Sequence, residues 1–245
     1  QINYTYPKIF ETFKDPFNIY CNLRNIAKPD FGYFIHLNSL QILSMSPEKF
    51  FTVSNNNIFT YPIKGTRPRS KNKSTDIKLS LELLNSNKDK AEHLMIVDLL
   101  RNDLGKICEY GSVDVTKLYD LKSYQTVHHL VTEIIGKLKP NIQEMNIIKA
   151  LFPGGSITGA PKEKAMKIID TIEEYSRGIY TGSIGYITSD NNMDFNIAIR
   201  TMTIQNNKAT YPVGGGIVWD SKTLDEWEET NLKARVLNNI IIKKT

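Results

Sequence analysis

The sequence predicts an α+β fold with antiparallel sheets. Segments with strand character come in runs and do not alternate one by one with helices, which argues against a doubly wound parallel sheet. Turns rich in Asn and Gly join neighbouring strands, as they do in antiparallel meanders. The 245 residues contain no repeat and no linker long enough to separate domains. We therefore expect one domain over residues 1–245, with helices flanking the sheets.

The N-terminal half is expected to begin with a strand over residues 1–6 and a helix over residues 15–29. Asp15 and Pro16 suit the start of that helix, and Phe17, Tyr20 and Leu23 or Ile26 would face inward. Short β segments are predicted at residues 32–37, 40–45, 49–54 and 58–61. Residues 67–76 are interpreted as a polar loop. A helix is predicted over residues 87–104, with Gly105 ending it.

The C-terminal half is expected to contain strands over residues 111–121 and 125–138 and a helix over residues 141–151. A second helix would start at Pro161, with Gly178 as its stop. Further strands are predicted at residues 182–188, 193–204 and 209–213. The sequence Gly214-Gly215-Gly216 and a last helix from about Leu224 complete the chain.

Composition indicates a soluble globular protein, because hydrophobic residues make up 40% and charged residues 23% of the chain. The formal net charge is +5, and part of the excess lies in residues 67–73. Aromatic residues do not interleave with these charges, so a nucleic-acid groove is disfavoured. A solvated loop explains the basic run better, and a basic surface would also suit a small dianionic substrate.

No apolar run approaches the ~20 residues that span a bilayer, so no membrane partner is expected. The two cysteines are far apart, and no spacing typical of a zinc site occurs. A cytoplasmic location is the expectation. Because the chain begins at Gln1 rather than Met, an N-terminal part is expected to be missing and organelle targeting stays open.

A glycine-rich stretch over residues 152–162 precedes the helix that starts near Pro161. Its glycines and prolines disfavour a regular helix or strand. Backbone N–H groups and the dipole of the following helix would together suit an anion. A tight turn without a ligand explains the same pattern.

Two predicted helices carry carboxylates at i, i+3 spacing. Asp89 and Glu92 share one helix face, and Glu226 and Glu229 share another, with Lys233 one turn further on. Such carboxylates, meeting over a substrate, could hold Mg²⁺ by a few oxygens. Surface charge is the alternative for both pairs. A capping box from Thr223 to Glu226 would also explain Glu226, but not Glu229.

Four further residues suggest chemistry on a small carboxylate. Lys64 lies beside Gly65 after a strand and would be a nucleophile if burial or cationic neighbours lowered its pKa. Glu48, at a strand junction, suits acid or base catalysis. His129 is either a hydrogen-bonded core residue or a site residue. Arg200 is either an edge charge or a bidentate carboxylate clamp.

These residues and their surroundings resemble the chorismate-utilising enzymes, which include the anthranilate, aminodeoxychorismate, isochorismate and salicylate synthases. The matching segments span the chain: Ser46-Pro47-Glu48, then residues 62–67, 91–103, 127–131 and 152–162, Ile199-Arg200-Thr201, residues 214–218, and Glu229-Thr230 with Lys233. The resemblance implies a large α+β domain whose antiparallel sheets enclose the active site. The family's N-terminal part is absent, so regulation by amino acids cannot be addressed.

Within the family, the similarity is greatest to aminodeoxychorismate synthase component I, whose motif carries a lysine at the position of Lys64. Anthranilate synthases usually have alanine there, and anthranilate synthase component I is the alternative function. Gln1 falls where isochorismate and salicylate synthases keep a lysine that activates water. Its amide cannot act as that base, which favours ammonia as the incoming group.

The resemblance also implies roles for individual residues. Glu92 and Glu229 would bind Mg²⁺, with Asp89 and Glu226 in the outer shell, although Asp89 stands where glutamate is usual. The catalytic residues would be Lys64, Glu48 and His129. The substrate-binding residues would be Gln1, Gly65, Thr66, Ser156, Tyr180, Arg200, Gly214, Gly215, Gly216 and Lys233. The partners would be chorismate, and ammonia supplied by a glutamine amidotransferase subunit or fused domain.

Overall fold

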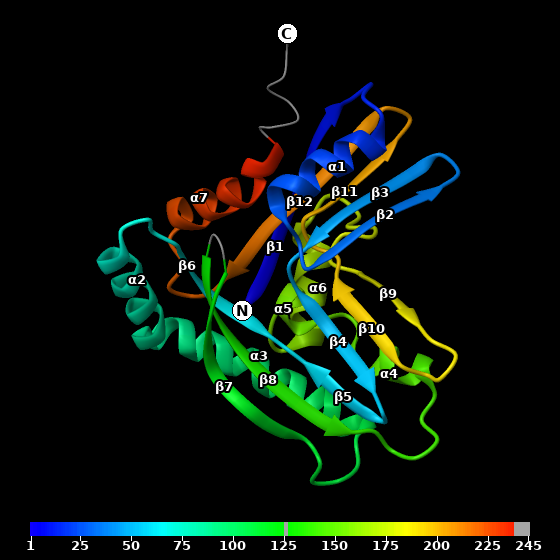
Figure 1. Cartoon of the computed structure of the whole chain (residues 1–245), viewed down its shortest axis with the longest axis vertical. Coiled ribbons are helices and arrows are strands. Elements are labelled where there is room, and N and C mark those ends of the chain that lie inside the picture. Colours follow the sequence, from blue (N-terminus) through cyan, green and yellow to red (C-terminus); the bar gives the residue numbers. More distant parts are fainter. Residues whose placement is uncertain (125–126, 238–245) are drawn as a thin grey trace. The chain divides into compact units, whose positions relative to one another are not determined.

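The computed structural model describes residues 1–124 and 127–237 and combines helices with antiparallel sheets (Figure 1). The chain divides into two compact units built from separated stretches of sequence. The first unit contains Gln1–Glu48, Ile157–Ile184 and Asn196–Thr245, and the second contains Lys49–Ser156 and Gly185–Phe195. The predicted α+β fold with antiparallel sheets is confirmed. The predicted start of a strand at Gln125 lies outside the described residues.

The first unit is organised on a five-stranded sheet. Its strand order is β1 (Ile2–Glu11), β12 (Lys208–Ile217), β11 (Thr201–Gln205), β3 (Leu40–Ser46) and β2 (Phe31–Leu37). The first strand pairs antiparallel with β12 over its whole length, from Ile2 opposite Ile217 to Glu11 opposite Lys208. A strand from the start of the chain therefore pairs with a strand from its C-terminal part at one edge of this sheet.

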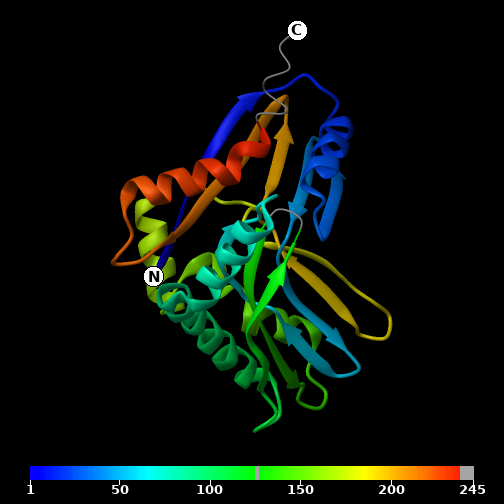
Figure 2. The same cartoon turned by 60° about the vertical axis from the view of Figure 1, so that its left-hand side comes forward.

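Helices α1 (Pro16–Ala27) and α7 (Thr223–Ala234), with the short helix η1 (Arg235–Leu237), supply the core of this unit (Figures 1 and 2). The Asp15 side chain accepts a hydrogen bond from Asn18 N and caps α1. Tyr20 and Leu23 face inward as expected, together with Ile19. Phe17, and Ile26 as the alternative to Leu23, are each 52% exposed, so these two expectations are wrong.

The segment that follows α6 (Lys162–Ile172) is tied to β1 by one buried ion pair. Arg177 donates to both carboxylate oxygens of Glu173, at 2.6 and 2.7 Å, and only 3% of the Glu173 side chain is exposed. Glu173 also accepts from Thr5 N and Thr5 Oγ1, while Arg177 donates to the carbonyls of Asn3 and Ile157. One pair therefore joins three separate segments of the first unit.

A seven-stranded sheet forms the centre of the second unit, with the ends of two strands contributed by residues of the first. Its order is β6 (Ile63–Pro68), β8 (Val127–Lys137), β5 (Asn57–Thr60), β4 (Lys49–Ser54), β10 (Met193–Ile197) and β9 (Ser183–Ile187), and β7 (Asp114–Ser123) pairs with β8. Helices α2 (Lys73–Asn85) and α3 (Asn87–Ile107) pack against β6 and β8, and α4 (Glu144–Leu151) packs against α3.

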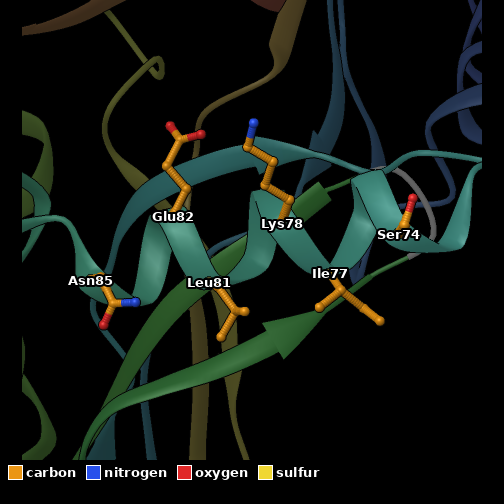
Figure 3. A pocket seen from close by; sticks show the side chains of 6 residues that line it. All are labelled: Ser74, Ile77, Lys78, Leu81, Glu82 and Asn85. Carbon is orange, nitrogen blue, oxygen red and sulfur yellow. The ribbon is translucent and has the colours of Figure 1, made fainter.

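The predicted polar loop over residues 67–76 is too long, because only residues 69–72 lie between β6 and α2. Arg67 and Pro68 end β6, and the first turn of α2 begins at Lys73, capped by the Asn72 side chain. Helix α2 was missed because Ile77, Leu79, Leu81 and Leu83 alternate with polar residues, and only Leu83 is buried. Figure 3 shows Lys78 and Glu82 of α2 pointing away from Ile77 and Leu81.

Three other predicted boundaries are also wrong. Helix α3 continues through Gly105 to Ile107. Gly105 does not adopt a positive φ, and the helical hydrogen bonding extends to Cys108, whose N–H donates to the Leu104 carbonyl. Helix α6 ends at Ile172, before Gly178. The predicted strand over residues 193–204 consists of β10 and β11, which belong to different sheets. Arg200, in the break between them, has a φ of 51°.

None of the helices in the described part of the chain is long and apolar enough to cross a membrane.

We predict that breaking the Glu173–Arg177 pair strongly destabilises the protein. Replacing Arg177 by Met would leave the Glu173 carboxylate buried without its counter-charge, so we expect the free energy of unfolding to fall by about 3–5 kcal/mol. Urea unfolding measures it. Arg101, whose pair with Asp98 is exposed, is the control, and Arg101→Met should change stability by at most ~0.5 kcal/mol. Equal effects of the two substitutions would contradict the assignment.

Candidate functional site

In the first unit, ionisable side chains of α7 gather over the glycines of β12. Lys233 Nζ lies 2.7 Å from Glu229 Oε1 and donates to the Gly214 carbonyl at 3.0 Å. A Cβ atom built on Gly215 would lie 3.6 Å from Glu226 Oε2 and 3.9 Å from Glu229 Oε1. The structure thus brings Glu226, Glu229 and Lys233 together in front of Gly215. Two carboxylates and an ammonium group on one side of a glycine strand can bind a cation and an anion together.

Glu226 does not belong to a capping box, so that prediction is wrong. The residue before α7 is Lys222, which provides no side-chain cap, and Thr223 is already inside the helix. Glu226 Oε1 instead accepts a hydrogen bond of 2.6 Å from Ser221 Oγ, which in turn accepts from Val218 N. These bonds fix the carboxylate at the start of the helix.

Gly214 allows β1 and β12 to approach each other closely. A Cβ atom at this position would lie 2.2 Å from the Tyr4 carbonyl oxygen and 2.5 Å from Thr5 Cγ2. A side chain here would push β1 away from β12. The three predicted glycines lie inside β12 and do not follow it, so they form part of the sheet beside Tyr4 and Asn3.

Arg200 lies near two buried tyrosines in the first unit. Burial raises the pKa of Tyr180 and raises the pKa of Tyr211 to about 12, while the Arg200 guanidinium acts on both phenols in the opposite direction. Tyr211 is fully buried, and its hydroxyl has no hydrogen-bond partner among the described residues. Tyr211 was not predicted as a site residue. Nothing in the sequence pattern around it marks its hydroxyl as unpaired.

Gln1 and Glu48 lie at two other places in the first unit. The Gln1 carbonyl accepts from Ala160 N, and a Cβ atom on Gly159 would lie 2.2 Å from that carbonyl oxygen, so Gln1 contacts the glycine-rich stretch. Glu48 follows β3, and its carbonyl accepts from Ile197 N. Ser46 Oγ, which donates to the Ile197 carbonyl at 2.6 Å, also accepts from Glu48 N.

In the second unit, Gly65 forms a bulge in the strand that carries Lys64. Lys64 lies opposite Leu130 of β8, and Thr66 lies opposite His129, so Gly65 is an extra residue. Its φ of 79° is the left-handed conformation that glycine adopts in such bulges. A bulge changes the alternation of side chains along a strand, and the Lys64-Gly65-Thr66 sequence therefore presents its side chains differently from a regular strand.

Thr66, Gly65 and His129 form a hydrogen-bonded group. His129 Nδ1 lies 3.0 Å from Thr66 Oγ1 and 3.3 Å from the Gly65 carbonyl oxygen. A carbonyl only accepts, so the bond to Gly65 requires the proton on Nδ1. Three predicted site residues are therefore together in this unit, and their bonds define which ring nitrogen carries the proton.

The carboxylates of α3 have different surroundings. Asp89 Oδ2 pairs with Arg67 Nη2 at 3.1 Å, and the Asp89 side chain is 20% exposed. Glu92 Oε1 lies 4.0 Å from Lys88 Nζ, one turn earlier on the helix. Glu92 belongs to the second unit and Glu229 to the first. No group of three or more His, Cys, Asp or Glu side chains suited to a metal occurs in the described ranges.

His93, next to Glu92, is a buried residue that the sequence reasoning missed. Its ring is fully buried, and Nε2 lies 2.6 Å from Thr132 Oγ1. Burial lowers the pKa of His93 to about 4, and the positive charge of Lys64 acts in the same direction. Lys64 is thus close to a histidine that stays neutral at physiological pH. The position of His93 on the apolar stripe of α3 was the available signal.

The glycine-rich stretch packs against its surroundings through its backbone. Ser156 lies in the one-turn helix α5 (Gly155–Thr158), where the sequence predicted no regular helix. A Cβ atom on Gly155 would lie 2.3 Å from Leu99 Cδ2, so a side chain there would clash with α3. The prediction of an anion at this stretch stays untested.

A surface depression of about 470 Å³ lies on α2 (Figure 3). None of its lining residues was predicted for the site: Ser74, Ile77, Lys78, Leu81, Glu82 and Asn85. Arg67, which reaches Glu82, was also missed because it was placed in a solvated loop. The Glu173–Arg177 pair was missed as well, although its i, i+4 spacing of opposite charges was visible.

Residues 1–239 match the family of chorismate binding enzymes. The chain belongs to this family. The resemblance found in the sequence motifs is thereby confirmed.

Relatives of this chorismate binding enzyme carry two different names. It is 46% identical over 227 residues to anthranilate synthase component 1 of Saccharolobus solfataricus, covering 93% of this chain and 54% of that protein. It is 44% identical over 216 residues to aminodeoxychorismate synthase component 1 of Escherichia coli, covering 88% of this chain and 48% of that protein. The chain thus spans about half the length of the curated relatives it matches.

A solved structure of an anthranilate synthase component I supports the fold of this chorismate binding enzyme. The crystal structure of anthranilate synthase component I from Streptococcus pneumoniae matches with a TM-score of 0.85 at 38% identity. The match covers 96% of this chain and 52% of that chain.

Two glycines of β12 make a matched pair for a stability test. Gly214→Ala places a methyl group against the backbone of β1 and should lower the free energy of unfolding by about 2–4 kcal/mol. Gly215→Ala meets its neighbours at ordinary contact distances and should leave stability within ~1 kcal/mol. Chemical denaturation of both variants measures the difference. Similar losses would show that β1 does not need the close approach.

His93 predicts a pH dependence of stability. Its pKa is lower in the folded state than in the unfolded state, so between pH 6.5 and 4 the unfolded chain binds more protons. Stability contributed by the neutral ring is present above pH 6.5 and is lost as the pH falls toward 4, by about 2 kcal/mol between pH 7 and 5. Urea unfolding at both values, without metal, measures it. His93→Gln should flatten the profile, and an unchanged profile would contradict the assignment.

Proposed function

We propose that this chorismate binding enzyme aminates chorismate to 4-amino-4-deoxychorismate, the activity of aminodeoxychorismate synthase component I. The observation that carries the proposal is Lys64, held in β6 beside the Gly65 bulge. Relatives named anthranilate synthase and aminodeoxychorismate synthase are about equally similar, so identity alone does not choose between them. A lysine at this position favours the second.

Lys64 is proposed as the nucleophile. Its neutral amine attacks ring carbon 2 of chorismate, both ring double bonds shift, and the 4-hydroxyl leaves as water with a proton from Glu48. Ammonia then attacks carbon 4, both double bonds shift back, Lys64 leaves as the free amine, and the Glu48 carboxylate accepts a proton from the added ammonia. His129 binds the departing or incoming group. This step needs the neutral amine, which burial or cationic neighbours would favour.

The two carboxylates of chorismate are proposed to bind at separate places. Lys233 and the backbone of Gly214, Gly215 and Gly216 would hold the ring carboxylate. Tyr180 and Arg200 would hold the enolpyruvyl carboxylate, since a guanidinium group and a phenol are both donors to a carboxylate. Gly65, Thr66 and Ser156 would line the ring pocket, and Gln1 would lie near the incoming ammonia.

Mg²⁺ fits the donors of α7, because Glu226 and Glu229 direct carboxylate oxygens to one point in front of Gly215. Glu229 and Glu92 would hold the ion, with Glu226 in the outer shell. When bound, it would neutralise the ring carboxylate of chorismate. A glutamine amidotransferase, as a subunit or fused domain, is proposed as the ammonia source.

Anthranilate synthase component I is the second candidate, favoured by the name of a relative that is 46% identical. It aminates carbon 2 and needs no lysine nucleophile. The products distinguish the two functions. Protein incubated with chorismate, Mg²⁺ and ammonium should yield a compound that a lyase converts to 4-aminobenzoate, identified by mass spectrometry. Formation of 2-aminobenzoate alone would contradict the proposal.

Replacing Lys64 by Ala tests the covalent role. Without the amine, the rate of 4-amination should fall by a factor on the order of 10³ or more, or the enzyme should form the 2-aminated product instead. The rate of 4-amino product formation measures this. Lys137→Ala removes an exposed lysine of the same unit, 57% exposed and paired with Glu109, and should leave the rate unchanged. A wild-type rate of 4-amination by the Lys64→Ala variant would contradict the assignment of Lys64 as the nucleophile.

A further inference from the structure

One guanidinium group holds the strand of Lys64 to two helices. Arg67 Nε donates to Glu82 Oε1 of α2 at 2.8 Å, and Nη2 donates to Asp89 Oδ2 of α3 at 3.1 Å. The third donor, Nη1, bonds to the Thr66 carbonyl at 2.9 Å. Arg67 is therefore bonded to α2, to α3 and to the residue next to the bulge.

The bulge at Gly65 places Lys64 and Arg67 on the same face of β6. Lys64 lies opposite Leu130 and Arg67 opposite His128, and alternate residues of β8 share a face. In a regular strand, residues three apart would point to opposite faces. The contacts agree with this register, because Arg67 reaches Asp89 in α3, the helix that packs against β6 and β8.

Asp89 contacts the bulge itself. A Cβ atom on Gly65 would lie 3.2 Å from both Asp89 Cβ and Asp89 Oδ1, so the aspartate packs directly against the glycine. Its other oxygen, Oδ2, is bonded to Arg67. Arg67 and Asp89 are only 24% and 20% exposed, so solvent weakens their pairing less than at an open surface.

We propose that Arg67 and Asp89 are positioning residues for Lys64, acting as a clamp on the Gly65 bulge. This inference rests on the proposed function, in which Lys64 is the nucleophile. The clamp fixes the backbone from which the lysine extends, and small displacements of a reacting group are costly to rate. Asp89 then serves the lysine and not the outer shell of a metal ion.

The clamp is tested with Arg67→Met, Asp89→Asn and the double variant. Each should lower kcat for 4-amination by about 10- to 100-fold, with the KM for chorismate within about twofold. The double variant should be no worse than the poorer single one, because both remove the same interaction. Mg²⁺ affinity, titrated calorimetrically with chorismate and without ammonium, should stay unchanged in Asp89→Asn and fall in Glu92→Gln.

Asp98→Asn is the matched control, since Asp98 lies on the same helix, pairs with Arg101 and is 60% exposed. It should leave kcat and Mg²⁺ affinity unchanged. Should Arg67→Met fail to fold, Arg67→Lys replaces it, because lysine keeps the charge but not the three-way donor geometry.

Three results would overturn the clamp. Wild-type kcat in Arg67→Met, in a protein that makes the 4-amino product, overturns the clamp alone. Loss of Mg²⁺ affinity in Asp89→Asn to the extent seen in Glu92→Gln assigns Asp89 to the metal instead. A wild-type protein that forms no 4-amino product overturns the proposed function, and the clamp with it.

Discussion

The first unit depends on the buried pair of Glu173 and Arg177. A carboxylate with 3% exposure is stable only when its charge and lone pairs are satisfied, and here it is bonded by Arg177 and by two donors of Thr5. Arg177 uses its other donors on the carbonyls of Asn3 and Ile157. The strand that begins the chain and the glycine-rich stretch are therefore held by the same two charges, which gives both segments one defined placement within the unit.

The glycines of the candidate site matter chiefly because they lack a side chain. At Gly214 the missing side chain lets β1 and β12 approach, and at Gly215 it leaves space in front of Glu226 and Glu229. At Gly65 a positive φ creates the bulge beside Lys64. Charged groups in each unit thus lie beside glycines. At Gly65 and Gly214 a side chain would be strained or would clash, whereas at Gly215 a methyl group would meet its neighbours at ordinary distances.

Much of the fold could be predicted from the sequence, because most strands alternate and are bounded by Asn-rich turns. Helix α2 could not be predicted, since it buries only Leu83. The break at Arg200 could not be predicted either, because a single apolar run of sequence forms strands of two different sheets. Candidate site residues on motifs, such as Lys64 and Glu229, could be named by resemblance. Arg67 could not, because its role depends on Glu82 in another element. The apolar stripe of α3 could indicate that His93 is buried, but not its bond to Thr132.

The pairing of β1 with β12 has a consequence for synthesis. Their partners are about 200 residues apart, so at ~5–20 residues per second the first strand waits roughly 10–40 seconds for its neighbour to leave the ribosome. During that time its hydrogen-bonding edge is unpaired, and unpaired edges recruit other chains. Chaperone binding to nascent chains of this protein is therefore expected to concentrate on β1 and to end once β12 has emerged.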